Sequence, residues 1–332
     1  MPSLAVGLLA TLDSKLRALS CRTGLVHYEG MSQVRSVKVI INARSGVGYE
    51  GETRSRLSEI FETIGVHADI SVAESGAEIV RLAEKAVRGD WSVVIAGGGD
   101  GTMNMVASHL SGTDKVLGVL PLGTLNHFAK DLKIPLDLEG AVETALSGRA
   151  VNVDVGDVNG RIFLNNSSLG LYPSIVRERQ KKQRLGSGKW PAFAWAAITA
   201  FRRYPFLHVR LDAGGEKFEL KTPFVFVGNN EYLMERLDIG GRARLDQGVL
   251  SVYVTDRTSR WGLVRLALRA LLGRLREERD FRALLTQEVT IETRHKRLQV
   301  AFDGEVEVLH RPLHYRSRPG ALRVMTPQGE NE

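Results

Sequence analysis

The chain has 332 residues, of which 43% are hydrophobic and 25% are charged. This length and composition predict about two globular domains and exclude a disordered chain, a coiled coil and a collagen-like fibre. The only cysteine, Cys21, excludes an internal disulfide framework, and no Cys/His spacing suits a structural zinc site. The net charge of +7 is uneven, because residues 1–160 sum to −4 whereas residues 161–332 sum to +11. Such asymmetry is typical of a nucleic-acid or membrane surface on the second half.

Residues 1–32 precede the first predicted strand and are interpreted as an N-terminal appendage. Leu8, Leu12 and Leu16 recur at helical spacing, which leaves two alternatives: a docking helix or frayed tail, or an amphipathic helix at a membrane interface. No window approaches about 18 uninterrupted apolar residues, so no membrane span is predicted. No basic residue precedes the apolar opening, so no signal peptide is predicted either.

From Val37 onward, short apolar runs alternate with amphipathic helical stretches. The pattern predicts strands at 37–41, 66–72, 91–96 and 116–120, and helices at 52–64, 77–87 and 103–110. Strands that alternate with helices in this way predict a mostly parallel sheet covered on both faces. Glycine-containing loops follow the strand ends, so we expect a binding site at the carboxyl edge of this sheet.

After about residue 150 the pattern changes to short β-like runs separated by turns. Strands are predicted at 151–158, 162–166, 206–211, 218–227, 249–254, 289–293, 298–302, 306–309 and 321–325, with helical stretches at about 190–203 and 260–276. The first two strands flank a turn at Asn159-Gly160. This half therefore reads as an antiparallel β domain with helical insertions.

The most informative motif is Gly98-Gly99-Asp100-Gly101-Thr102-Met103-Asn104, which follows a buried strand and opens a helix. Backbone N–H groups and the helix dipole can hold phosphate at such a point, and glycines let the backbone approach the anion. The spacing is neither that of the dinucleotide motif G-x-G-x-x-G nor that of a Walker A loop. A carboxylate beside phosphates is tolerated mainly where a divalent cation neutralises both. The alternative is a tight turn with a capping Asp.

Further loops identify a family. Asn42-Ala43-Arg44-Ser45-Gly46 and Pro121-Leu122-Gly123-Thr124-Leu125-Asn126 end two other strands, and Val153-Asp154-Val155-Gly156 and Phe302-Asp303-Gly304-Glu305 lie further on. Together with the glycine–aspartate loop they resemble the diacylglycerol kinase catalytic-domain family, specifically its soluble bacterial lipid kinases, which are related to sphingosine and ceramide kinases. The resemblance runs from about Val37 to Thr326.

The resemblance implies an α/β protein of two domains. The first would be a three-layer α/β nucleotide-binding domain like that of NAD kinases and diacylglycerol kinases, at 33–150 with about 313–327 returning to it. The second would be a β-sandwich-like lipid-substrate domain at 151–312. The implied activity is an ATP- and Mg²⁺-dependent phosphotransfer to the hydroxyl of diacylglycerol or a related lipid, giving phosphatidic acid or a similar lipid phosphate.

The resemblance also implies roles for individual residues. The ATP-binding residues would be Asn42, Ala43, Arg44, Ser45, Gly46, Gly98, Gly99, Asp100, Gly101, Thr102, Asn104, Thr124 and Asn126. Asp100 would organise Mg²⁺, with Asp154 and Asp303 as further candidate metal ligands. Glu305 would be the base that takes the proton from the lipid hydroxyl, and Asp303 and Asp100 complete the candidate catalytic set. These residue types suit phosphoryl transfer, which needs positioning, charge neutralisation and an oriented hydroxyl.

The chain departs from the family pattern at three positions. Ala43 replaces the usual proline of the first loop, and His127 stands where many members have Asp, so one carboxylate of the expected magnesium network is missing. Gln247 stands where some bacterial members have a second Asp, which argues against their structural metal site beside Asp246. Two alternatives to a lipid kinase remain: a NAD-kinase-like enzyme with a soluble substrate, and a non-catalytic nucleotide- or lipid-binding regulator, for which His127 is the best argument.

Two basic regions lie in the positively charged half. Residues 177–189 contain six Lys and Arg against one Glu, and residues 257–282 contain eight Arg against three acidic residues. With the aromatic stretch at 190–198 they suit an anionic bilayer, single-stranded nucleic acid, or a solvated basic face over core aromatics. The family resemblance favours a cytoplasmic protein that binds reversibly to the inner face of the membrane. The expected partners are then a lipid substrate and anionic phospholipid, without nucleic acid, and a homodimer is left open.

Overall fold

The computed structural model describes residues 36–45, 51–170, 173, 206–233, 241–255 and 281–328. The predictions for residues 1–32, for Gly46, for the helical stretches near 190–203 and 260–276, and for the basic regions up to residue 280 lie outside the described residues. In the described part of the chain, no helix is both long enough and apolar enough to cross a membrane.

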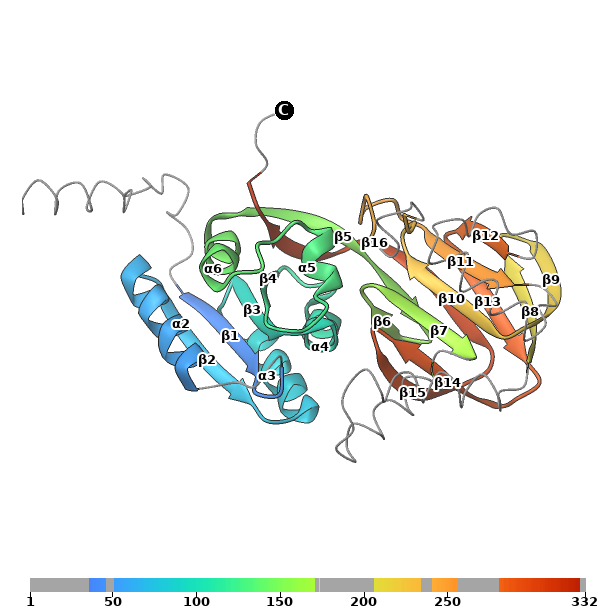
Figure 1. The fold of residues 1–332 in the computed structure, drawn as a ribbon, viewed down its shortest axis with the longest axis horizontal. Coiled ribbons are helices and arrows are strands. Elements are labelled where there is room, and N and C mark those ends of the chain that lie inside the picture. The colour runs from blue at the N-terminus through green and yellow to red at the C-terminus, as the bar shows by residue number, and fades with distance from the viewer. Residues whose placement is uncertain are drawn as a thin grey trace, which may run out of the picture. The chain divides into compact units, whose positions relative to one another are not determined.

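A parallel sheet with helices between its strands forms the first region (Figure 1). Its strands are β1 (Ser36–Asn42), β2 (His67–Ala73), β3 (Val93–Gly98) and β4 (Val116–Pro121), in the order β2-β1-β3-β4. The helices are α2 (Gly51–Ile64), α3 (Gly76–Arg88), α4 (Asp100–Leu110), α5 (His127–Asp131) and α6 (Leu138–Ser147). Because the strands are parallel, the loops that follow β1, β3 and β4 lie at the same edge of the sheet.

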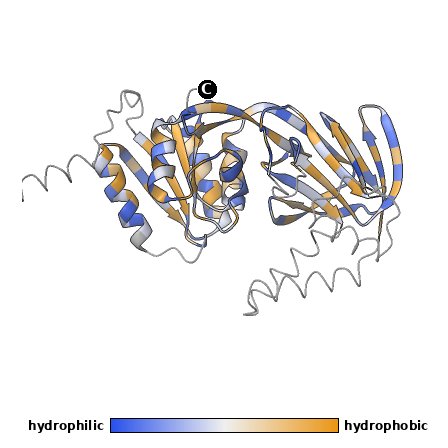
Figure 2. Ribbon diagram, turned by 45° about the horizontal axis from the view of Figure 1, so that its top comes forward, coloured by the Kyte–Doolittle hydropathy of each residue, from blue (hydrophilic) through white to orange (hydrophobic). Residues whose placement is uncertain are grey.

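Local sequence explains these elements well, as α3 illustrates. Ser75 is its N-cap, and the Ser75 side chain accepts a hydrogen bond from the N–H of Glu78, while Gly89 follows its last residue. Its buried residues recur at helical spacing and pack toward the sheet: Ile79, Leu82, Ala83 and Ala86. Figure 2 shows mostly hydrophobic residues along the central strands and a mixture of hydrophilic and hydrophobic residues along the helices.

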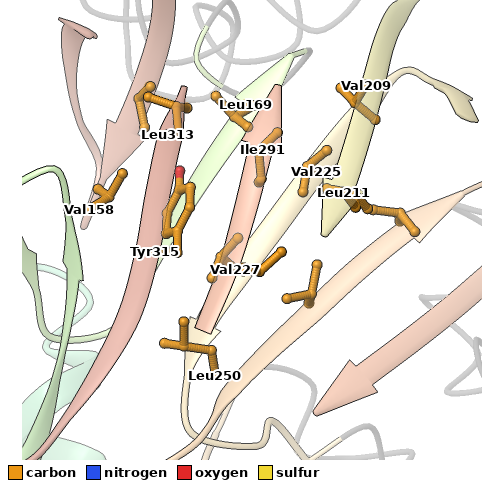
Figure 3. Close-up of a cluster of buried hydrophobic side chains, with 14 of the residues drawn as sticks. Val158, Leu169, Val209, Leu211, Val225, Val227, Leu250, Ile291, Leu313 and Tyr315 are labelled. Carbon is orange, nitrogen blue, oxygen red and sulfur yellow. The ribbon is translucent and has the colours of Figure 1, made fainter. Parts of the chain in front are cut away.

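The second region consists of antiparallel strands around an apolar core. The strands are β5 (Arg149–Val158), β6 (Arg161–Phe163), β7 (Asn166–Gly170), β8 (Leu207–Ala213), β9 (Glu216–Thr222), β10 (Phe224–Asn229), β11 (Leu250–Thr255), β12 (Phe281–Thr286), β13 (Glu288–Thr293), β14 (Arg297–Phe302), β15 (Glu305–His310) and β16 (Leu313–Thr326). One sheet has the order β12-β11-β10-β7-β14-β15. Figure 3 shows side chains of both sheets in the core, among them Val209 and Ile291 from one sheet and Leu169 and Val225 from the other.

The long strand β16 continues one sheet through both regions. Its first residues pair antiparallel with β13, whereas Arg323 and Val324 pair in parallel with β4. β5 pairs antiparallel with β16 along most of its length, with a register shift between Arg318 and Leu322. The result is a ten-stranded sheet in which β2-β1-β3-β4 is followed by β16-β13-β8-β9.

Two predicted strands are each divided in the structure, and two helices were not predicted. The run at 218–227 forms β9 and β10, because Pro223 between them has no N–H to donate to a sheet. The run at 162–166 spans the end of β6 and the start of β7. The sequence analysis did not identify α5 and α6. The turn at Asn159-Gly160 is confirmed: both residues have positive φ, at 51° and 84°, and they join β5 to β6.

Candidate active site

Three loops converge at the carboxyl edge of the parallel sheet. The Asn42 side chain, after β1, donates a hydrogen bond to the hydroxyl of Thr102 in the glycine–aspartate loop, at 2.9 Å. That loop in turn meets the loop after β4, since a Cβ atom added to Gly123 would lie 2.4 Å from the Cα of Gly99. Only glycine allows this approach of two backbones. The convergence predicted from the sequence is therefore confirmed for these loops.

The glycine–aspartate loop leaves the first turn of α4 open to a ligand. Gly99 is the N-cap of α4 and has extended backbone angles, and, in the residues described here, no side chain caps the helix. The first N–H groups of a helix have no partner within it, and together with the helix dipole they form a site for an anion. Thr102 in this turn is 3% exposed, and Gly98 lies directly over its hydroxyl.

Asp100 connects this loop to the next one. Its two carboxylate oxygens accept hydrogen bonds from the backbone N–H groups of His127 and Phe128, at 3.2 and 3.1 Å. Asp100 thereby caps the N-terminus of α5 from a distant point in the sequence. The side chain of Asn165, from the second region, also donates to Asp100 at 3.4 Å. The predicted magnesium residue is thus also the point where three segments meet.

Asn126 gives the loop after β4 its shape. It lies in the left-handed region, with φ of 52°. Its side-chain amide donates to the carbonyl groups of Pro121 and Gly123, at 2.9 and 3.1 Å, and its oxygen accepts from the N–H of Gly123 at 3.0 Å. Asn126 therefore holds the loop, while Thr124 is exposed and available to a ligand. In the first loop Arg44 is exposed, and its N–H donates to the side chain of Asn42.

A tight hairpin turn places Glu305. Asp303 and Gly304 join β14 to β15 and both have positive φ, at 46° and 87°, as an Asp-Gly two-residue hairpin requires. The Asp303 carboxylate accepts three backbone N–H groups, those of Leu164, Asn165 and Asn166, at 2.8, 2.8 and 3.0 Å. Burial raises the pKa of Asp303 to about 6, although these three donors oppose the shift. Asp303 thus fixes the turn.

The Glu305 carboxylate lies over the first turn of α4. A Cβ atom added to Gly101 would be 2.9 Å from Oε1 of Glu305. The residue keeps an exposed side, yet its partial burial raises the pKa of the carboxyl above the usual range for Glu. The neighbouring Glu307 carboxylate adds to this increase in pKa, and Arg161 opposes it. A carboxylate with a raised pKa beside an anion-binding helix turn is suited to accept a proton.

A pocket of about 230 Å³ extends from Glu305 along α4. Its wall is apolar at Met105, Ile162 and Phe302 and polar at Ser108 and Arg161. The pocket lies between α4 and the strands of the second region, so it gives Glu305 access to a ligand of mixed polarity.

Asp154 is held by backbone donors of two other segments. It is 2% exposed, and its carboxylate accepts the N–H groups of Gly248 and Gly320, at 2.6 and 2.8 Å. Among the residues that the structure describes, no three His, Cys, Asp or Glu side chains form a group that could hold a metal ion. Asp154 instead anchors the turn before β11 to the bend in β16.

The sequence analysis missed a buried polar network beside Asp100. Arg242 binds Asp131, at the end of α5, and also the side chain of Asn165. No local motif marks these three residues, because they are distant in the sequence and become neighbours only in the folded chain. Their burial is the signal, since an Arg is rarely buried without an ionic partner.

Comparisons with known proteins agree with this geometry. The family model described as the diacylglycerol kinase catalytic domain matches residues 36–158, and that of the YegS C-terminal NAD kinase beta sandwich-like domain matches residues 170–326. A Staphylococcus aureus (strain JH9) protein named diacylglycerol kinase is 26% identical over 231 residues, which are 68% of this chain and 72% of that protein. A crystal structure of a diacylglycerol kinase from Bacillus anthracis str. Sterne has the same fold, with a TM-score of 0.70 at 22% identity, covering 89% of this chain and 98% of that chain.

The fold and the matched domains define a two-domain phosphotransferase, with a catalytic α/β domain followed by a β-sandwich-like domain. Within that class, the chain belongs to the diacylglycerol kinase catalytic-domain family. Both the recognised family and the predicted fold class are thereby confirmed. Membership of a kinase family implies a phosphotransferase that uses ATP.

Proposed function

We propose that the protein transfers the γ-phosphoryl group of ATP to the hydroxyl of diacylglycerol or a related lipid, which yields phosphatidic acid or a similar lipid phosphate. The position of Glu305 is the observation that carries the proposal. Its carboxylate lies at Gly101, on the helix turn where phosphate would bind. A proton acceptor at the phosphate site, beside a partly apolar pocket, supports transfer to an alcohol.

The loops fit the phosphates of ATP. The open N-terminus of α4 offers backbone N–H groups, Thr124 offers an exposed hydroxyl, and Gly99 and Gly123 leave room for a close approach. Mg²⁺ is usually held by one or two carboxylates together with substrate phosphates and waters. Asp100 fits that requirement at the phosphate loop, where Mg²⁺ would neutralise the phosphate charge. Asp100 lies in the glycine–aspartate loop itself, whereas Asp154 is 2% exposed and Asp303 is held by three backbone N–H groups in the turn before Glu305, so we assign the metal to Asp100 alone.

In the proposed reaction the lipid hydroxyl enters the pocket beside Glu305. The hydroxyl oxygen forms a bond to the γ-phosphorus as the bond from that phosphorus to the leaving oxygen of ADP breaks. Its proton passes to the Glu305 carboxylate. In a loose transition state the proton leaves late, so a carboxylate with a raised pKa is a sufficient base.

We further propose that the protein acts at the inner face of the membrane and binds anionic phospholipid there reversibly. The support is the sequence of the second half, where residues 177–189 and 257–282 concentrate positive charge beside aromatic residues. Each cation near an anionic bilayer contributes about 1 kcal/mol to binding.

Label transfer from γ-labelled ATP tests the proposed reaction. With Mg²⁺ and mixed micelles of diacylglycerol, we expect label in the lipid; EDTA should abolish the transfer and added Mg²⁺ should restore it. Glu305→Gln should lower kcat by about 10²-fold or more, because general base catalysis contributes about 10²–10⁴-fold. A Glu219→Gln variant is the matched control, since Glu219 is an exposed carboxylate on β9.

Two results would overturn the proposed lipid kinase, and a third would overturn only the role of Glu305. Label in NAD but in no lipid would identify a soluble-substrate kinase, and ATP binding without any transfer would identify a regulator. Unchanged turnover in Glu305→Gln would leave the lipid kinase in place but remove Glu305 as its base. A screen of extracted lipids under the same conditions would then identify the preferred acceptor.

A further inference from the structure

Arg242 is a fully buried cation between the two regions of the chain. Its side chain is 0% exposed, and Asp131, which is 7% exposed, pairs with it through Nε at 2.8 Å and Nη2 at 2.7 Å. The N–H of Arg242 also donates to Asp131 at 3.3 Å. Asp131 is the last residue of α5, the helix whose first turn is capped by Asp100. The ion pair therefore ties the far end of that helix to the segment that precedes β11.

The remaining donors of Arg242 reach the corner between β6 and β7 and the end of β10. Nη1 donates to the carbonyl groups of Leu164 and Asn229, at 2.7 and 3.0 Å, and Nη2 donates to the side-chain oxygen of Asn165 at 2.7 Å. The guanidinium also lies over the ring of Tyr232, 5.7 Å from its centroid. A planar guanidinium can serve all these acceptors at once, which an ammonium group cannot.

The same corner is held from its other side by Asp303. Arg242 binds the carbonyl of Leu164 and the side chain of Asn165, whereas Asp303 accepts the N–H groups of both residues. Two routes therefore leave Arg242. One runs through the Asn165 side chain to Asp100, and the other runs through the backbone of residues 164–166 and Asp303 to Glu305, two residues further along.

We propose that Arg242 is a positioning residue for phosphoryl transfer, which sets the Glu305 carboxylate relative to the glycine–aspartate loop through Asn165 and Asp303. The inference rests on the proposed role of Glu305 as the base. A buried ion pair contributes little net stability compared with well-packed apolar residues of similar volume. Its geometric effect is larger, because a displacement of about 1 Å at reacting groups can cost about 10²-fold in rate.

A paired substitution separates the two effects. Arg242→Met alone would leave Asp131 buried without a counter-ion and is expected to destabilise the fold. In the double variant Asp131→Leu/Arg242→Met both charges are gone, so we expect a higher thermal midpoint than in Arg242→Met alone. The midpoint should still lie below that of the wild type, because the carbonyl groups of Leu164 and Asn229 lose their donor. We expect kcat for lipid phosphorylation to fall about tenfold or more. The KM for ATP should change by less than about threefold, because the phosphate loops keep their own hydrogen bonds.

Asn165→Ala provides a second test of the inference if the double variant fails to fold. It removes the link between Arg242 and Asp100 but retains the ion pair, and it should also lower kcat more than it raises the KM for ATP. The control is Arg244→Met/Asp246→Leu, which removes an exposed ion pair two residues further along the same segment and should leave both constants unchanged. The inference would be overturned if the wild type phosphorylates lipid and either Asn165→Ala or a folded Asp131→Leu/Arg242→Met variant has the same kcat as the wild type. A wild type that phosphorylates no lipid would instead refute the proposed function.

Discussion

At the residue scale, hydrogen bonding separates the four carboxylates of the candidate site. Asp303 accepts three backbone N–H groups, and Asp154 and Asp100 accept two each. Such donors hold a carboxylate in one orientation. Burial raises the pKa of both Asp303 and Glu305, but Glu305 lies at the head of β15, over Gly101 and beside the pocket. Of these four carboxylates in the described structure, Glu305 is therefore the one suited to exchange a proton.

The charges next to Glu305 predict the pH dependence of the reaction. Glu305 must be deprotonated to act as a base, so activity should fall as the pH drops through its pKa, which lies above the usual value for Glu. Glu307 raises this pKa and Arg161 lowers it. Glu307→Gln should therefore move the acid limb of the kcat/KM profile to lower pH, and Arg161→Met should move it to higher pH.

The comparison between these two variants is the informative measurement. Arg161 and Glu307 form an ion pair with each other, so a non-specific effect of breaking that pair would shift both profiles in the same direction. Opposite shifts would support Glu305 as the titrating base. Shifts in one direction, or none, would assign the acid limb to another group.

At the scale of elements, two glycine loops approach each other closely at the proposed phosphate site. Gly123→Ala should abolish the close approach, because the added Cβ would lie 2.4 Å from the Cα of Gly99 and 2.6 Å from the Asn126 side chain. We expect weaker ATP binding by about tenfold or more, since displaced loops no longer present their donors together. Isothermal titration calorimetry with an ATP analogue measures the dissociation constant of each variant.

A second glycine substitution provides the control for that experiment. In Gly76→Ala, at the start of α3, the new Cβ would meet only the flexible end of Met105 at 3.2 Å. ATP affinity should stay at the wild-type value there. Equal affinity in Gly123→Ala and the wild type would show that the loops do not act as a unit.

The elements also show how far the sequence predicts the structure. Helix α3 follows from its cap and its apolar spacing, and the Asn159-Gly160 turn follows from its residue types. Helix α5 has only five residues, and its cap is Asp100, 27 positions earlier in the chain. A local pattern contains neither fact. Helix α6, in contrast, could have been predicted from local sequence, because Asp137 is its N-cap and accepts a hydrogen bond from the N–H of Gly140.

The residues of the candidate site likewise differ in how far the sequence alone reveals them. The three loops were identified because their residues are contiguous and follow predicted strands. The resemblance groups Asp154 with Asp100, whereas its hydrogen-bond partners, Gly248 and Gly320, are more than ninety positions away in the sequence and are visible only in the fold. Arg242 and Asp131 are separated by 111 positions, so only the fold reveals their pairing. Contacts of this kind depend on chain topology, which local periodicity does not encode.

At the scale of the whole molecule, one strand pairs with two parts of the chain that are distant in the sequence. β16 pairs with β13 at its start and with β4 near its end, so the carboxyl end of the described chain completes the sheet begun by its first strands. β16 also carries Gly320, which binds Asp154. The described strands of the second region are therefore joined to the first region through continuous backbone pairing.

The charge asymmetry predicts how the enzyme would reach an insoluble substrate. Binding to vesicles that contain anionic phospholipid should be reversible and should weaken as salt rises from about 0.01 M to 0.15 M, because the screening length falls from about 30 Å to about 8 Å. Neutral phosphatidylcholine vesicles should bind weakly at every salt concentration. Co-sedimentation with vesicles measures both affinities.

Two variants with equal loss of charge decide where this attraction originates. The first variant changes four cations within 177–189 to Gln: Arg177, Arg179, Lys181 and Lys182. It should bind vesicles more than about tenfold more weakly, because each cation near the bilayer contributes about 1 kcal/mol to binding. Changing four cations of the acidic half should have a much smaller effect: Arg54, Arg81, Arg88 and Arg149. Because net charge falls equally in both variants, a difference between them reflects a local surface. An equal loss of vesicle affinity in both variants would show that net charge, and not a local surface, causes the binding. Binding that is insensitive to salt would refute the electrostatic mechanism.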